Sequence, residues 1–280
     1  MRPAAAAHAG VAVAFLVAGC AHRPPMAVAE KPARVPSVVE HRTSASATVA
    51  RTTNRFDGAG RLSRTERDLD GDGRPEQVIT YGYDPAGHLI LVDEGERVLR
   101  YEVDATGRLL ARTSELRGHL VTRTEMRYDA RGRLVAEESG GTVLRYRFDD
   151  AGRLEGEQRF ESGEAAPRAE KRFTYDPRGR RVAADGFDET GRIHQSWRYD
   201  RAGRVVSETL VRNGATVIET RTRHDSAGRR IGEEYRDGSG ALTGRRTLTY
   251  NASGDLATDE QVDLDPPSWT RDQLSYPADR

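Results

Sequence analysis

The segment from Asp68 to Glu76 has the residue types and spacing of a cation-binding loop. It reads DLDGDGRPE, with three carboxylates at alternate positions and a fourth shortly after. A tight loop can bring the side-chain oxygens of Asp68, Asp70, Asp72 and Glu76, together with the backbone carbonyl of Arg74, around one Ca²⁺, which takes oxygen ligands. The sequence therefore makes Ca²⁺ the one candidate cofactor.

Two interpretations of this loop are open. It is similar to the calcium loops of β-propeller FG-GAP repeats, but it is not a complete EF-hand, because Ile79 stands at the twelfth position where a bidentate Glu is needed. Asp70 to Arg74 also has the Asp-x-x-Gly-Arg spacing of the repeat described below. The segment is therefore either a metal loop or one more hairpin tip.

Little in the chain favours nucleophilic catalysis. The motifs G-x-S-x-G and H-E-x-x-H and the phosphate-binding loop do not occur. Four of the seven histidines are dispersed along the repeat region, at His88, His119, His194 and His224. Neighbouring acids such as Glu233 and Glu234 would point to opposite faces of a strand, where we expect solvated surface charge. We therefore predict no catalytic residues and a non-enzymatic protein.

The only cysteine ends a signal-like segment. Residues 1–19 carry Arg2 and then an Ala-rich apolar run that is too short for a retained membrane-spanning helix. The string Val17-Ala18-Gly19-Cys20 resembles the lipobox of bacterial lipoproteins, which implies cleavage before Cys20 and acylation of its thiol. The alternative is an ordinary signal peptide whose apolar region ends in Cys. Ala21, in place of the Asp that retains such proteins at the inner membrane, implies the outer membrane or cell surface, with the acyl chains as the membrane contact.

Residues 20–54 are predicted to be a lipid-anchored flexible tether. They contain four prolines among Ala, Ser, Thr and Arg, and they show no sustained period of a helix or a strand.

Composition limits the classes of fold and partner. Of 280 residues, 36% are apolar and 31% are charged, which argues against a thick core. The 44 basic and 44 acidic residues balance, so the positive field of a nucleic-acid-binding protein is missing. With 28 Gly and 12 Pro, many short elements and turns are favoured over long helices.

From residue 56 onward one pattern recurs: an aromatic residue, Asp, two variable residues, Gly, usually Arg, and an aliphatic residue. It resembles the YD repeat of the Rhs family over about residues 56 to 256. Together with the lipobox at Cys20, this resemblance implies a YD-repeat bacterial lipoprotein. The Asp and Gly positions of the copies are Asp57 and Gly60, Asp84 and Gly87, Asp104 and Gly107, Asp129 and Gly132, Asp149 and Gly152, Asp176 and Gly179, Asp188 and Gly191, Asp200 and Gly203, and Asp225 and Gly228.

The spacing of the repeat predicts a hairpin tip at each copy. Asp favours the first position of a type I turn, and a Gly in the left-handed conformation closes a three-residue loop with a bulge. The Asp then faces the residue after the Gly, as Asp129 would face Arg133. The aromatic residue would face the aliphatic one, in the pairs Tyr128 with Leu134, Phe148 with Leu154, Tyr199 with Val205 and Phe187 with Ile193.

The predicted fold class is all-β. Residues 55–258 are expected to form a long antiparallel meander of YD/Rhs-type hairpins, in a twisted or curled open sheet, and residues 259–280 to form a C-terminal tail. Between the tips the chain alternates as half-buried strands do, with Leu144 and Tyr146 on one face and Arg145 on the other.

The leading functional hypothesis is a non-enzymatic, lipid-anchored envelope protein whose sheet binds a glycan or a protein. The alternative is a structural or assembly role, in which edge strands pair with a secreted Rhs-type effector. No nucleic-acid partner is expected.

Overall fold

The computed structural model describes residues 35–43, 46–264 and 267–276, all within the unit Pro32–Arg280. All regular structure in these ranges is β-strand. The twenty strands are β1 (Val38–Thr43), β2 (Ser46–Phe56), β3 (Leu62–Asp68), β4 (Gln77–Tyr83), β5 (Leu89–Asp93), β6 (Arg97–Val103), β7 (Leu109–Leu116), β8 (His119–Tyr128), β9 (Leu134–Ser139), β10 (Thr142–Phe148), β11 (Leu154–Glu161), β12 (Ala169–Tyr175), β13 (Arg181–Asp188), β14 (Gly191–Tyr199), β15 (Val205–Arg212), β16 (Ala215–His224), β17 (Arg230–Asp237), β18 (Leu242–Tyr250), β19 (Leu256–Leu264) and β20 (Pro267–Ser275). Within the described ranges, no helix is long and apolar enough to span a membrane.

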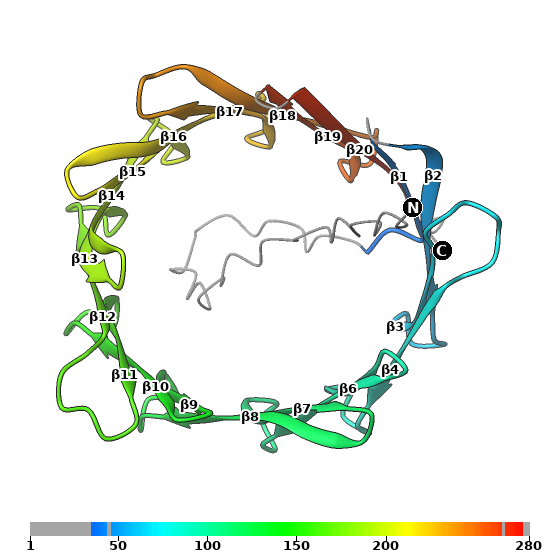
Figure 1. Ribbon diagram of the computed structural model, residues 1–280, viewed down its shortest axis with the longest axis horizontal. Coiled ribbons are helices and arrows are strands. Elements are labelled where there is room, and N and C mark those ends of the chain that lie inside the picture. The colour runs from blue at the N-terminus through cyan, green and yellow to red at the C-terminus, as the bar shows by residue number, and fades with distance from the viewer. Residues whose placement is uncertain (1–34, 44–45, 265–266, 277–280) are drawn as a thin grey trace, which may run out of the picture. The chain divides into compact units, whose positions relative to one another are not determined.

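The strands form one closed antiparallel sheet (Figure 1). Consecutive strands pair from β2 to β20, and β1 pairs with both β2 and β20. At this seam Val38 lies opposite Ser275 and Thr43 lies opposite Thr270. The predicted all-β antiparallel meander is therefore confirmed, and the predicted open sheet is wrong.

The closing strands come from the two segments that the sequence did not predict to be structured. Strand β1 and most of β2 lie within the predicted tether 20–54, and β20 lies within the predicted tail 259–280. Those two boundaries are therefore wrong, and residues 20–34 lie outside the described ranges. The strands contain β-branched Val and Thr, which suit a pleated sheet, but polar residues interrupt any apolar face that would have revealed them.

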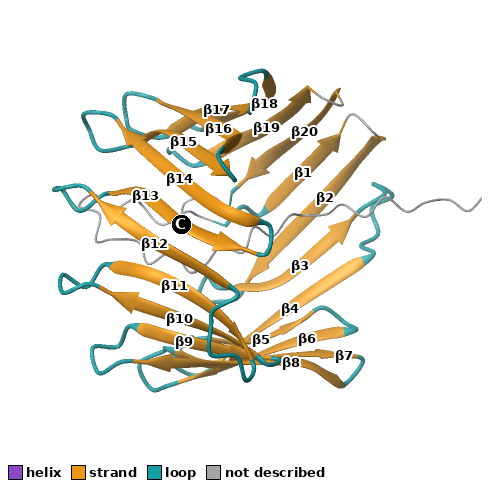
Figure 2. Cartoon of the chain, turned by 60° about the vertical axis from the view of Figure 1, so that its left-hand side comes forward, coloured by secondary structure: helices purple, strands orange, loops and turns teal. Residues whose placement is uncertain are grey.

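Because the strands alternate in direction, the hairpin turns alternate between two ends of the sheet (Figure 2). We call the first end the Asp–Arg rim, which in the described residues carries the turns that begin at Asp57, Asp84, Asp104, Asp129, Asp149, Asp176, Asp200, Asp225 and Asn251. We call the other end the opposite rim. It carries the connections between β3 and β4, between β13 and β14, and between β15 and β16.

The sheet encloses few buried side chains. In the described ranges no side chain is less than 2% exposed. The buried apolar residues are Ile79, Val92, Ala111, Leu154, Phe160, Ala184 and Leu248. Polar residues such as Thr65 and Ser207 are buried beside them. Backbone ladders and cross-strand pairs therefore carry more of the stability here than they would in a globular core of the same length.

Candidate functional site: the two rims of the closed sheet

Each turn of the Asp–Arg rim is held by its own aspartate, as the turn after β12 shows. The Asp176 N–H donates to the Arg180 carbonyl at 2.9 Å, and the Gly179 N–H donates to the Asp176 carbonyl at 2.9 Å. Gly179 has a φ of 76°, a left-handed conformation that glycine adopts without steric cost. One carboxylate oxygen of Asp176 accepts the Arg180 N–H at 2.9 Å, and the other accepts Arg180 Nε at 2.7 Å.

The same arrangement recurs along the rim with informative substitutions. The carboxylates of Asp57, Asp104, Asp129, Asp149, Asp200 and Asp225 each pair with the arginine four positions later. His88 takes the place of arginine and pairs with Asp84 at 2.9 Å. In the last turn the charge is reversed, and Asn251 Oδ1 accepts the Asp255 N–H at 2.9 Å.

These hydrogen bonds change the acidity of the rim. The backbone N–H of Arg180 and then its side chain hold the pKa of Asp176 below the ordinary value of 3.8. The N–H four positions later is likewise the main cause of the lowered pKa at Asp57, Asp84, Asp129, Asp149 and Asp200. Several carboxylates therefore stay ionised in the folded protein at a pH where the unfolded chain would bind protons.

We expect acid to unfold the protein as these aspartates titrate. A carboxylate with a lowered folded pKa stabilises the fold fully above its unfolded pKa of about 3.9, and this contribution disappears as pH falls through the folded pKa. The melting temperature should be nearly constant from neutral pH to about pH 5 and should fall steeply below about pH 4. Thermal melts across this range measure it. The double variant Asp176→Asn/Asp200→Asn should give a shallower decline, and a wild-type melting temperature that stays constant down to pH 2 would contradict the expectation.

Successive turns of the rim are also joined to one another, which the spacing of the repeat did not predict. The Arg180 guanidinium lies over the ring of Tyr199, which belongs to the next turn, with 4.6 Å from Cζ to the ring centroid. The Tyr199 hydroxyl donates back to the Arg181 carbonyl at 2.6 Å. Equivalent stacks join Arg61 to Tyr83, Arg108 to Tyr128, Arg133 to Phe148, Arg153 to Tyr175 and Arg229 to Tyr250. The signal was in the repeat itself, because Arg and an aromatic residue recur in every complete copy.

The copy at Asp188 lies at the opposite rim and has a different turn. Asp188 is paired directly with Gly191, so the loop has two residues and Gly191 has a φ of 125°. Phe187 consequently faces Arg192, and Ile193 faces Gly186. The predicted pairing of Phe187 with Ile193 is therefore wrong, because it assumed the three-residue loop of the other copies.

The acidic loop also lies at the opposite rim, between β3 and β4. One oxygen from each of Asp68, Asp70, Asp72 and Glu76 lies within 4.8 Å of the others. Backbone N–H groups of the loop donate hydrogen bonds to the same carboxylates, as the Gly71 N–H does to Asp68 Oδ1 at 2.6 Å. The loop shows none of the bonds of a rim turn between Asp70 and Arg74 in the described residues. It is therefore a longer connection than a hairpin tip, and its convergent oxygens suit a hard cation.

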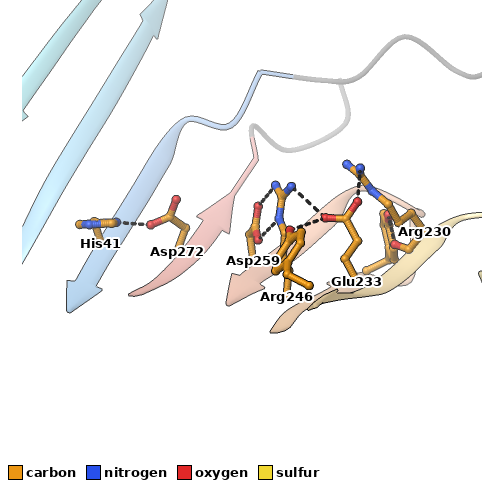
Figure 3. Close-up of polar contacts among 8 residues, drawn as sticks. His41, Arg230, Glu233, Arg246, Asp259 and Asp272 are labelled. Atoms are coloured by element: carbon orange, nitrogen blue, oxygen red, sulfur yellow. Dashed lines mark hydrogen bonds and ion pairs between the residues drawn. The ribbon is translucent and has the colours of Figure 1, made fainter. Parts of the chain in front are cut away.

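A network of charged side chains crosses β17, β18 and β19 near the seam (Figure 3). Arg246 pairs with Asp259 through two bonds of 2.8 and 2.5 Å, and Arg230 pairs with Glu233 at 2.8 Å. The Tyr235 hydroxyl donates to Glu233 at 2.8 Å, and burial, with this bond, raises the pKa of Tyr235 to about 12. Glu233 is only 9% exposed. The expectation that Glu233 is solvated surface charge is therefore wrong.

At the seam itself a separate pair joins the two strands, because His41 on β1 contacts Asp272 on β20 (Figure 3). Every group in the network has a partner, so these residues join the strands near the seam. Cys20, the predicted lipidation site, lies outside the described residues.

The chain is similar to the Tc holotoxin pore of Photorhabdus luminescens, at 16% identity and a TM-score of 0.38, over 80% of this chain and 14% of that chain. It is similar to the TcdB2-TccC3 structure at 16% identity and a TM-score of 0.36, over 80% of this chain and 15% of that chain. The chain is also similar to a porin-like protein from Bacteroides uniformis, at 12% identity and a TM-score of 0.40, over 87% of this chain and 98% of that chain.

No curated protein matches the chain. The family model described as Teneurin YD-shell matches residues 39–221, which is more than half of the 280 residues. That range contains seven complete turns of the Asp–Arg rim, from Asp57 to Asp200, and the stacks between them. The chain belongs to the Teneurin YD-shell family.

Proposed function

We propose that this protein is a non-enzymatic, lipid-anchored shell of the cell envelope that binds an envelope glycan or protein. The closure of the sheet is the observation that supports the shell, since β1 pairs with both β2 and β20, whereas the anchor is proposed from the sequence that ends at Cys20. A closed sheet has its backbone groups satisfied on both sides of each strand. Such a framework keeps its surface in a fixed geometry, which suits a binding or enclosing role.

The alternative role, pairing of a sheet edge with a secreted Rhs-type effector, needs an unpaired strand. Each of the twenty described strands has a neighbour on both sides. Edge pairing therefore loses its structural basis, and a protein partner would have to contact side chains.

The non-enzymatic part of the proposal agrees with the contacts of three histidines. Three histidines contact aspartates, in the pairs His41 with Asp272, His88 with Asp84 and His194 with Asp185. These pairs belong to different hairpins. None of the three imidazoles hydrogen-bonds to a hydroxyl or thiol of the described residues, as a base that activates a nucleophile would.

The anchor is tested at Cys20. In a Gram-negative host grown with an alkyne-labelled fatty acid, the wild-type protein should carry the label and sediment with the outer membrane. Several acyl chains on one residue make an anchor that does not readily leave the bilayer. Cys20→Ser should lose the label and appear in the soluble fraction of the envelope. A Cys20→Ser protein that keeps the label, or an unlabelled wild type, would contradict the anchor.

We also propose that the acidic loop binds Ca²⁺ through Asp68, Asp70, Asp72 and Glu76, with the carbonyl of Arg74. CaCl₂ at about one hundred times the dissociation constant should stabilise the fold by about 2.7 kcal/mol and raise the melting temperature by several degrees. The variant Asp70→Asn/Asp72→Asn should lose this response. The matched control is Asp93→Asn, which removes a carboxylate from the neighbouring hairpin turn on the same rim. An equal response in all three proteins, or none in the wild type, would contradict the calcium site.

A further inference from the structure

Next to the two-residue turn between Asp188 and Gly191, at the opposite rim, the sheet forms a groove of about 640 Å³. Its lining side chains follow from the register of β12 to β15. In one row across the strands, Glu170 lies opposite Phe187, which lies opposite Arg192. In the neighbouring row the partners are Arg172, Asp185, His194 and Val211. Directly paired residues and residues two apart share a face of a sheet, so both rows present their side chains to the same groove.

The groove has an aromatic ring that the shell does not use. Phe187 is the aromatic residue of the Asp188 copy, and its side chain is 38% exposed. In the described residues no arginine is stacked over it, unlike Tyr175 and Tyr199 of the copies on either side. The two-residue turn at Asp188 is the cause, because it places Phe187 opposite Arg192. An exposed ring within a concave site is a common element of ligand recognition.

The charged side chains of the groove form pairs, except for Arg192. Arg172 Nε pairs with Glu170 at 2.6 Å, and His194 Nδ1 lies 2.7 Å from Asp185. The Arg192 guanidinium has no hydrogen bond or ion pair within the described residues, although its backbone N–H donates to Asn213 Oδ1 at 2.9 Å. An arginine without a partner beside an aromatic ring favours an anionic ligand, because its guanidinium binds a carboxylate through two parallel hydrogen bonds.

Two glycines fix the backbone in and beside the groove. A Cβ built on Gly186 would lie 1.8 Å from the Glu170 carbonyl oxygen, so β12 and β13 approach here as only glycine allows. A Cβ on Gly191 would lie 2.2 Å from Asn213 Oδ1. The Asn213 Nδ2 group donates to the Thr190 carbonyl at 3.1 Å and joins the two turns beside the groove. The site is therefore shaped before any ligand binds, which lowers the entropic cost of binding.

We propose that this groove binds a carboxylate-bearing saccharide, an inference that rests on the proposed envelope-binding function. The Phe187 ring accepts the C–H face of a pyranose, since those hydrogens carry partial positive charge and the face of the ring is negative. The Arg192 guanidinium pairs with the sugar carboxylate. Asp185, whose side chain is 64% exposed, accepts hydrogen bonds from sugar hydroxyl groups, and His194, whose side chain is 46% exposed, donates a hydrogen bond to one.

The test measures binding of oligogalacturonate to the purified full-length protein by calorimetry, with malto-oligosaccharide of the same length as the neutral probe. The wild type should bind the acidic probe more tightly, and added salt should weaken this binding. Phe187→Ala and Arg192→Gln should each weaken it roughly tenfold or more, the range of a central contact residue. Phe187→Tyr keeps the ring and should bind within a few-fold of the wild type.

Two matched controls lie outside the groove. Leu120→Ala removes a 65% exposed apolar side chain from β8, and Arg198→Gln removes an exposed charge from β14, the strand that carries Arg192. Both should bind as the wild type does, and unchanged circular dichroism melts would show that the groove variants are folded. Binding that survives both groove substitutions would overturn the groove while leaving glycan binding in place. A wild type that binds neither probe, yet retains a stoichiometric protein partner after envelope cross-linking, would overturn the saccharide and leave the proposed envelope function standing.

Discussion

Replacing Gly186 by alanine is expected to lower the free energy of unfolding by about 3 kcal/mol, the upper part of the range for an overpacked site. The added Cβ would lie 1.8 Å from the Glu170 carbonyl oxygen and 2.8 Å from its carbonyl carbon. Both atoms belong to the backbone of β12, so no side-chain rotation can relieve the clash. The pair β12 and β13 must separate, and the ladder from Glu170 to Tyr175 would be distorted with it.

The matched control is Gly58→Ala in the first turn of the Asp–Arg rim. A Cβ there meets no atom within 4 Å, and the backbone does not have the positive φ that disfavours alanine. This substitution should leave stability unchanged or raise it by up to about 1 kcal/mol, because alanine restricts the unfolded chain. Urea unfolding followed by circular dichroism measures both variants. Equal stabilities for Gly186→Ala and Gly58→Ala would show that the close approach of β12 and β13 has no energetic consequence.

Local spacing was enough to predict much of the Asp–Arg rim. The number of residues between Asp and Gly determines the type of turn, and the turn determines the register of the two strands. Tyr128 therefore lies opposite Leu134, and Phe148 lies opposite Leu154, as the spacing predicts. The all-β class followed from the alternation of residues such as Tyr146 and Arg145. Each of these inferences involves residues close in sequence, for which the geometry of a hairpin leaves few choices.

The closure of the sheet depends on contacts that no local pattern reports. Val38 and Ser275 lie at opposite ends of the chain, and the strands that contain them have no clear apolar face. The sequence therefore indicated a meander without indicating how it ends. The exposed position of Phe187 was missed for a related reason. Its copy matches the repeat in residue type, but it lies one strand out of phase, so its turn is at the other rim.

The stack between successive turns is expected to couple their side chains energetically. Arg180 pairs with Asp176 in its own turn and lies over Tyr199 in the next, with 4.6 Å from Cζ to the ring centroid. A guanidinium above an aromatic ring is attracted by the negative face of the ring, by about 0.5–2 kcal/mol depending on how far the pair is removed from water. Both single variants, Arg180→Ala and Tyr199→Leu, should therefore destabilise the protein.

A double-mutant cycle separates this coupling from the separate effects of the two residues. The double variant Arg180→Ala/Tyr199→Leu should be less destabilised than the sum of the single variants by about 0.5–2 kcal/mol. The matched control pairs Arg178→Ala, an exposed arginine in the same turn, with Tyr199→Leu, and its effects should add. Additive effects for Arg180 and Tyr199 would mean that the turns stabilise the shell independently. A measured coupling would mean that each turn supports the next, so that damage to one repeat should weaken its neighbour along the rim.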